Sequence, residues 1–268
     1  MNGFDGLRRF APAARDVGDA LRFFTRAPVG GASASAPLAI DRFAWAAPVA
    51  GAAVGLAGAL ALALAGLFGL PPLMRAALAT AALVAASGGL HEDGLADVAD
   101  GFGGGATRAE KLDIMRDSRI GAYGAIALTL ALILRVAALS AALDGGFWRA
   151  SASLIAVAAL SRAGALTPLA LLDPARADGA GAAAGRLDPG ALVAAWGSAL
   201  IIALILGLVS LGLAHVVAAA LASAAAAWAM VALARRAIGG QTGDVAGAAQ
   251  QLAEIAAWCG LLIGHAAS

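Results

Sequence analysis

The sequence predicts an all-α fold, a single polytopic bundle of about seven transmembrane helices formed by residues 1–268. Hydrophobic residues make up 61% of the chain and charged residues 13%. A soluble domain carries about a quarter charged residues. Long charge-free stretches alternate with short polar ones, and none shows the alternating pattern of a membrane β-barrel strand. Abundant alanine and glycine suit helices that pack closely in lipid.

The charge-free stretches locate the expected spans in order. A bilayer core needs roughly twenty helical residues to cross it. The stretch 189–234 is about twice that length, so we expect two spans there, broken near Gly212–His215. The expected spans lie at about 43–74, 76–90, 120–143, 150–172, the two halves of 189–234, and 245–266.

The basic residues indicate the orientation of these spans. Alternation of seven spans puts fourteen of the 18 Lys and Arg residues on the side of the N-terminus, and only Arg75 and Arg149 on the other. Because basic loops are retained in the cytoplasm, we expect a cytoplasmic N-terminus. Residues 1–42 would form a cytoplasmic leader, in which Val17 and Leu21 share one helical face. Either an interfacial helix or a solvated leader fits that pattern.

Charge and cysteine usage exclude several classes of function. A net charge of +1 gives no basic field for nucleic acid. The single cysteine, Cys259, excludes an internal disulfide and a thiolate metal cluster. We therefore expect no nucleic-acid partner. The lipid bilayer is the expected environment, and a homo-oligomer stays open.

An acidic catalytic loop is expected at residues 91–119, which hold seven of the 17 acidic residues. On a helix Asp93, Asp97 and Asp100 would lie within about 60° of arc, flanked by Glu92. Carboxylates so close repel one another unless a cation or a proton lies among them. Oxygen ligands without thiolates favour Mg²⁺, Mn²⁺ or Ca²⁺. We predict a metal site at these four residues; a solvated acidic segment that ends a helix is the alternative.

Phosphate-type ligands follow directly. Glycines let backbone amides approach phosphate oxygens, although a flexible loop has the same composition. The guanidinium fork suits phosphate, and neutralising charge around phosphorus is most of what phosphoryl transfer requires. Ion pairs on a helix surface would explain the same charges. The substrate-binding candidates are Gly103, Gly104, Arg108 and Arg119, and the catalytic candidates are Arg116 and Asp117 beside Asp93, Asp97 and Asp100.

A second polar, glycine-rich patch precedes the last expected span. Thr242, Gly243 and Asp244 would open that helix, where free amides can receive phosphate or ribose oxygens. A simple N-cap is the alternative. Arg162 and Glu254 fall within spans, where ionisable groups are functional or paired with one another. We expect Arg162 to line the substrate cavity.

Four separated stretches together resemble the motifs of the cobalamin synthase, or adenosylcobinamide-GDP ribazoletransferase, family. The resemblance extends from about residue 20 to residue 255. It implies an Mg²⁺-dependent enzyme of the bacterial cytoplasmic (inner) membrane, with its site facing the cytoplasm. Such an enzyme joins adenosylcobinamide-GDP to α-ribazole, or to its 5′-phosphate, and releases GMP in the nucleotide-loop assembly step of cobalamin biosynthesis. The stretches are Arg22–Pro28, Glu92–Asp97 with Asp100-Gly101, Met115–Gly124, and Gly240–Asp244.

Two other functions remain open. The Asp-Gly-x-Ala-Asp arrangement from Asp93 to Asp97 is also similar to that of the CDP-alcohol phosphotransferases. A transporter with a carboxylate-lined ion site is a third reading, but it would need carboxylates near the bilayer midplane and inverted repeats. The general base is expected to be a carboxylate, with His91 as the alternative.

Overall fold

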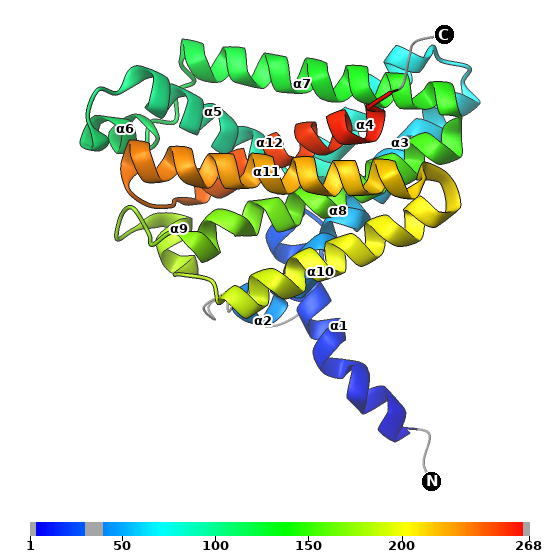
Figure 1. Cartoon of the computed structure of the whole chain (residues 1–268), viewed down its shortest axis with the longest axis horizontal. Coiled ribbons are helices and arrows are strands. Elements are labelled where there is room, and N and C mark those ends of the chain that lie inside the picture. Colours follow the sequence, from blue (N-terminus) through cyan, green and yellow to red (C-terminus); the bar gives the residue numbers. More distant parts are fainter. Residues whose placement is uncertain (1–3, 30–39, 265–268) are drawn as a thin grey trace.

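The computed structural model describes residues 4–29 and 40–264, which form a bundle of helices with no β-strand among them (Figure 1). The predicted all-α fold is therefore confirmed. The helices are α1 (Phe4–Phe24), α2 (Ile40–Phe43), η1 (Ala44–Ala46), α3 (Ala47–Leu67), α4 (Pro72–Ser87), α5 (Leu90–Gly104), α6 (Arg108–Ile114), α7 (Ala122–Ala142), η2 (Leu143–Gly145), α8 (Phe147–Leu171), α9 (Gly179–Ala184), α10 (Pro189–Leu206), η3 (Gly207–Leu211), α11 (Leu213–Ile238) and α12 (Gly243–Leu262).

The number of candidate spans is somewhat smaller than the seven expected. In the described part of the chain, five helical segments are long and apolar enough to cross a membrane, or six if a bent pair counts as one span. The five are Ile40–Leu67, Ala122–Gly145, α8, α10 and α11. α10 and α11 are separated at η3 and Gly212, close to the break expected between them.

The bent pair consists of α4 and α5, which meet at an angle of 90°. Gly88 and Gly89 form the corner, and both adopt the left-handed conformation, with φ of +69° and +71°. Glycine reaches this region without the steric cost of a Cβ atom. The second expected span therefore ends after the 16 residues of α4, and α5 runs at a right angle to α4. The acidic segment is thus mostly helical: it contains α5 and α6, with short non-helical stretches at 105–107 and 115–119.

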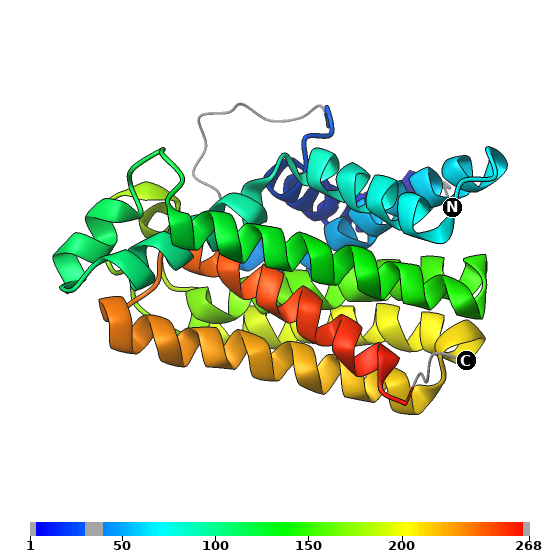
Figure 2. The ribbon, with the colours of Figure 1, turned by 90° about the horizontal axis from the view of Figure 1, so that it is seen from above.

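α12 replaces the seventh expected span. It lies between α11 and α7 and packs on α8 and α5 (Figures 1 and 2). Gln250, Gln251 and Glu254 lower its hydropathy, and all three side chains are buried inside the bundle. The polar residues of α12 therefore contact other helices, where they can be paired.

The centre of the bundle is α8, which is almost entirely buried. α3, α10, α11 and α12 surround it. At Gly51 of α3 an added Cβ would lie 2.3 Å from the carbonyl oxygen of Ala158. At Gly260 of α12 a Cβ would lie 2.6 Å from the backbone of Ala218 in α11. Small residues thus permit backbone approach, as expected for helices in lipid.

The C-terminal half of α1 is part of this bundle. Ala20 and Phe24 are buried in the core. Arg42 forms ion pairs with Asp16, at 2.9 Å from Nε to Oδ1, and with Asp19. These contacts fasten α2 to α1. Residues 30–39 of the expected leader lie outside the described part of the chain.

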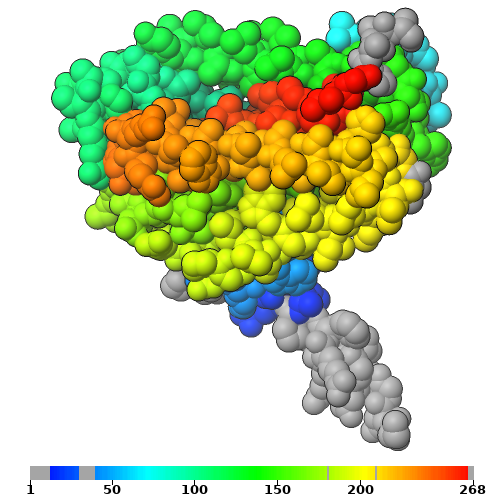
Figure 3. Space-filling view, in the orientation of Figure 1, coloured from blue at the N-terminus to red at the C-terminus, as the bar shows by residue number. Residues whose placement is uncertain are grey.

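The charged connections gather at one end of the molecule, here called the polar end. It is formed by residues 105–121, 172–188 and 239–243, whereas the turns 143–146 and 207–212 lie at the opposite end (Figures 1 and 3). Gln241 ties two of the polar segments together, because its backbone oxygen accepts from the N–H of Ala175 at 2.8 Å.

Candidate active site

A pocket of about 700 Å³, here called the polar pocket, opens beside the first turns of α5. Its wall combines side chains that are far apart in the sequence. Asp93 and Asp97 come from one face of α5, and Arg22 and Arg26 come from the end of α1 and the residues after it. The remaining lining residues are Phe23, Thr25, Ser87, Gly88, Gly89, Leu90, Glu92, Ala96, Ser118, Ile120 and Leu128.

Asp93 and Asp97 lie one helical turn apart on α5, outside the five spans. Asp93 is exposed and Asp97 is half-buried. The pKa of Asp97 is raised from 3.8 to about 7, first by burial and then by the negative charges of Asp93, Asp244 and Asp100. The predicted crowding of carboxylates is therefore present around Asp97. Such a site favours a proton or a cation.

The other two predicted metal ligands have protein partners. The carboxylate of Asp100 is buried and accepts from the backbone N–H groups of Gly121 at 2.7 Å and Gly124 at 2.8 Å. An added Cβ at Gly124 would lie 2.3 Å from that carboxylate, so only glycine permits this approach. Asp100 therefore fastens the start of α7 to α5. Glu92 lines the polar pocket, but its Oε1 is occupied by Arg135 of α7, at 2.7 Å.

The donor set of the polar pocket fits a magnesium ion. Within residues 4–29 and 40–264, no three His, Cys, Asp or Glu side chains converge as a ready-made metal cage. Mg²⁺ is commonly held by only one or two carboxylates together with substrate phosphates and water. Asp93 and Asp97 supply two such carboxylates. The Oε2 atom of Glu92 is buried without a hydrogen-bond partner among the described residues, and could add a third oxygen.

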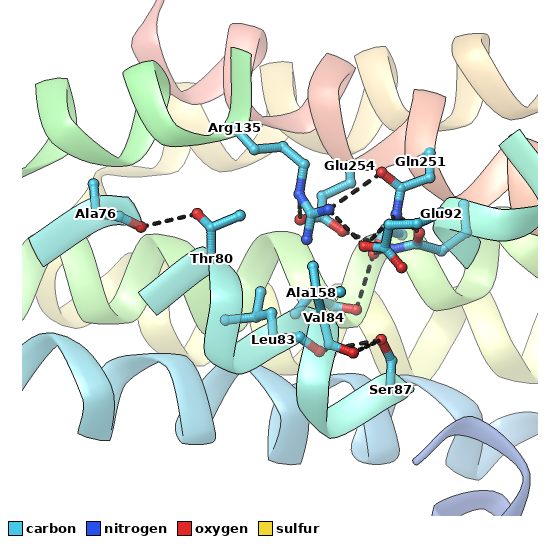
Figure 4. A network of polar contacts seen from close by, with 12 residues as sticks. Ala76, Thr80, Leu83, Val84, Ser87, Glu92, Arg135, Ala158, Gln251 and Glu254 are labelled. Carbon is cyan, nitrogen blue, oxygen red and sulfur yellow. Dashed lines mark hydrogen bonds and ion pairs between the residues drawn. The ribbon is translucent and has the colours of Figure 1, made fainter. Parts of the chain in front are cut away.

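Behind the pocket, a polar network lies inside the bundle (Figure 4). Arg135 lies between Glu92 and Glu254, and its Nε is 2.8 Å from Oε1 of Glu254. Gln251 donates to Glu92 at 3.1 Å. Arg162 is 3.9 Å from Glu254 and is 2% exposed. Two carboxylates thus balance two guanidinium groups, as buried charges require.

This network corrects the expectation for Arg162. Its side chain lines neither the polar pocket nor the narrower pocket described below. Arg162 is instead paired with Glu254, another ionisable residue expected within a span. It belongs to the scaffold behind the pocket, because desolvation of a guanidinium inside the bundle demands a counter-charge.

The basic residues of the polar end are engaged with other protein groups. Arg116 binds Asp178 at 2.8 Å, and Arg119 binds its neighbour Asp117 at 2.5 Å. Arg108 donates to the carbonyl of Ala175 at 2.9 Å. In the segment 105–121, Ser118 and Ile120 line the polar pocket. Arg108, Arg116 and Arg119 do not.

Gly103 and Gly104 belong to the last turn of α5 and are exposed. Neither has a positive φ, and neither lines the polar pocket. An added Cβ at Gly103 would lie 2.8 Å from the ring of Tyr123, so close packing of α5 against α7 explains that glycine. The structure therefore does not bring the expected glycine cradle to the carboxylates.

The second glycine-rich patch does reach the carboxylates. Gly243 and Asp244 line a narrow pocket of about 120 Å³, here called the apolar pocket, which shares Asp93 with the polar pocket. α5 and α12 approach closely, because a Cβ at Gly94 would lie 2.8 Å from the carbonyl oxygen of Asp244. Burial raises the pKa of Asp244. Thr242 accepts from the N–H of Val245 at 3.2 Å and is the N-cap of α12.

Two groups of pocket residues were not predicted as site residues. Arg22 and Arg26 lie in a stretch that resembles a family motif, but the sequence alone assigns no chemical role to them. Gly181 and Ala184 line the apolar pocket from α9, in a segment without any motif. Only their contacts with distant helices reveal these four residues.

The fold and the pocket define a multi-pass membrane protein of the helix-bundle class, with a carboxylate- and arginine-lined pocket beside its α4–α5 corner. Its sequence matches the cobalamin-5-phosphate synthase family over residues 16–262, and the chain belongs to that family.

Two relatives cover nearly the whole chain. An adenosylcobinamide-GDP ribazoletransferase of Azorhizobium caulinodans is 54% identical over 254 residues, which are 92% of this chain and 95% of the relative. A protein of the same name from Xanthobacter autotrophicus is 48% identical, over 93% of this chain and 96% of the relative. No solved structure matches the chain.

Proposed function

We propose that this protein transfers the adenosylcobinamide-phosphate moiety of adenosylcobinamide-GDP to α-ribazole, or to its 5′-phosphate, and releases GMP. Family membership supports the choice of substrates. The polar pocket carries the proposal chemically, because it sets Asp93 and Asp97 in one wall with Arg22 and Arg26. A pyrophosphate bound with a divalent cation requires ligands of both signs.

In the proposed reaction, a ribose hydroxyl of α-ribazole attacks the corrinoid-side phosphorus of the pyrophosphate. A P–O bond to the ribose forms, the P–O bond to GMP breaks, and the hydroxyl proton passes to a carboxylate. Asp244 is suited to accept that proton, since its pKa is raised and it lines a pocket together with Asp93. Mg²⁺ held by Asp93 and Asp97, with Glu92 adjacent, would neutralise charge on the phosphate oxygens.

The arginines would orient the pyrophosphate. Guanidinium groups bind phosphate oxygens through paired N–H donors. Arg22 also forms an ion pair with Asp19, which restrains its side chain at the pocket. Arg26 packs against Gly88, where an added Cβ would overlap the guanidinium. Both cations thus approach the carboxylates from the side of α1.

We further propose that the polar end and its pocket face the cytoplasm of a bacterial inner membrane. Arg108, Lys111, Arg116, Arg176 and Arg186 all lie in the segments of that end. Loops with such an excess of Lys and Arg are retained in the cytoplasm during insertion.

The activity is tested with purified protein reconstituted in lipid. We expect adenosylcobalamin and GMP in equal amounts from adenosylcobinamide-GDP, α-ribazole and Mg²⁺, and no product in EDTA. Asp93→Asn and Asp97→Asn should abolish turnover without loss of folded protein. Asp144→Asn, at the opposite end of the bundle, is the matched control. Release of CMP from a CDP-alcohol, with no cobalamin formed, would instead favour the phosphotransferase alternative.

The phosphate role of the arginines has its own test. Arg22→Gln and Arg26→Gln should each lower kcat/KM for adenosylcobinamide-GDP by about tenfold to a hundredfold. A loss of this size corresponds to the free energy that one charge-assisted hydrogen bond contributes to the transition state. Arg15→Gln, on the exposed face of the same helix, should change little. Equal, small effects of all three substitutions would remove the arginines from the site.

A further inference from the structure

The apolar pocket differs in chemistry from the polar pocket that it adjoins. It lies between the end of α1, the first turn of α5, the end of α8 and the start of α12. Leu166 and Leu169 line it from α8, and Ala246 and Gly247 line it from α12. Small and aliphatic side chains thus form most of its wall.

One wall of this pocket is aromatic. The ring of Phe24 is stacked on the ring of His91, with centroids 6.1 Å apart and planes inclined by 8°. Both residues line the pocket, and both are buried. Parallel rings beside small residues suit a flat aromatic guest, because such rings favour offset stacking.

The polar groups of the apolar pocket are few. His91 is 3% exposed, and its Nε2 atom has no hydrogen-bond partner among the described residues. A buried polar atom of this kind normally has a partner. Asp93 and Asp244 supply the other polar atoms, and carboxylates accept hydrogen bonds from hydroxyl groups. The pocket therefore combines an apolar slot with acceptors for hydroxyl groups.

From this geometry we infer that the apolar pocket is the subsite for α-ribazole. The benzimidazole base lies in the slot between the Phe24–His91 pair and Leu169, and the ribose lies toward Asp93 and Asp244. This assignment rests on the proposed function. It leaves the polar pocket to adenosylcobinamide-GDP, the much larger substrate, since that pocket has a volume of about 700 Å³ and the apolar pocket one of about 120 Å³.

The assignment explains why the two pockets share a wall. Asp93, Leu90 and Phe23 belong to both. A ribose hydroxyl directed toward Asp93 would therefore lie where the pyrophosphate of the other substrate also arrives. The reacting atoms would meet at the junction, with each substrate held by its own pocket.

Filling the apolar pocket tests the assignment. Ala246→Leu, with Ala246→Val as a milder variant, adds bulk inside the slot. Ala256→Leu is the matched control, because Ala256 is also half-buried on α12 but lines neither pocket. Binding of α-ribazole is measured by titration calorimetry on the full-length protein, and the KM of each substrate is measured at saturation with the other.

We expect Ala246→Leu to weaken α-ribazole binding and raise its KM at least tenfold, with a smaller effect of Ala246→Val. The KM for adenosylcobinamide-GDP should stay within twofold, and Ala256→Leu should match the parent. Unchanged α-ribazole binding and KM in Ala246→Leu would overturn the subsite, even with full transferase activity. Conversely, if the parent protein binds α-ribazole but forms no cobalamin, and Ala246→Leu loses that binding, the subsite is upheld and only the proposed reaction is overturned.

Discussion

Asp97 has the most consequential environment of any single residue in the polar pocket. It is half-buried on α5, and this burial together with three nearby carboxylates raises its pKa to about 7. Near neutral pH, this site therefore changes readily between a protonated and a charged form. A cation bound at Asp93 and Asp97 would compete with that proton, which links metal affinity to pH.

The first prediction follows from that link. In Mg²⁺-free buffer, the contribution of Asp97 to the free energy of unfolding should be largest at low pH and should be lost as the pH rises through about 7. The reason is that the folded state binds the proton of Asp97 more tightly than the unfolded state does. Melting curves between about pH 5.5 and about pH 8 measure this effect. Asp97→Asn should flatten the dependence, and Asp144→Asn should not. Mg²⁺ should raise the melting temperature more at the upper pH, and an equal gain at both would contradict metal binding at Asp97.

Asp100 acts through the backbone. Its carboxylate accepts two N–H groups at the start of α7, so Asp100→Asn would turn an amide donor toward one of them. We expect a loss of about 1–3 kcal/mol in the free energy of unfolding. Mg²⁺ affinity, measured by calorimetry, should remain close to that of the parent. Asp113→Asn, on the exposed face of α6, is the control, and a selective loss of Mg²⁺ affinity in Asp100→Asn would return Asp100 to the metal site.

At the scale of elements, the position of α5 depends on two devices. The glycine corner turns it by 90° from α4, and the Glu92–Arg135–Glu254 network fastens it to α7 and α12. Gly94 lets the start of α12 approach α5 closely. The carboxylates therefore reach the pocket because several helices meet at α5.

The network can be tested by removing its central charge. Arg135→Gln leaves Glu92 without its guanidinium partner and Glu254 with Arg162 alone, and breaking a buried pair costs about 3–5 kcal/mol. Arg236→Gln, on the exposed last turn of α11, should have little effect. The double variant Arg135→Gln with Glu92→Gln should lose less than the sum of the two single losses. Strictly additive losses, measured by unfolding in detergent, would show that the two residues are not coupled.

At the scale of the whole molecule, the bundle has one charged end and one end of short turns. Residues of α6 and of the segment 172–188 lie at the first, and η2 lies at the second. The polar pocket opens among side chains of α1, α5 and the segment before α7. The orientation proposed for the membrane therefore determines from which side both substrates must arrive.

Labelling with an impermeant thiol reagent tests that orientation. In a Cys259→Ala background, Asp144→Cys should react in intact cells, because η2 is expected on the outer side. Ala109→Cys and Ala177→Cys, both exposed at the polar end, should react only after the membrane is opened. Reaction of Ala109→Cys in intact cells would overturn both the orientation and the cytoplasmic site.

The sequence by itself determined the class of fold and the family. Charge-free stretches predict helices in lipid wherever they occur, since the bilayer requires apolar residues along a span. The spacing of Asp93 and Asp97 also predicted that they share a helix face, since the helical period sets the direction of each side chain. Both predictions depend only on neighbours within a few residues.

Tertiary structure decided which of these side chains meet. The sequence offered no partner for Arg135, and it did not distinguish the roles of Asp93 and Asp100 on one helical edge. The partners of Arg135 lie on α5 and α12, and those of Asp100 lie at the start of α7. Helical periodicity carries no information about what packs against a face. The same reason explains why Arg22 joined the pocket whereas Arg162 did not. A buried charge is held by whichever counter-charge the packing of distant helices supplies.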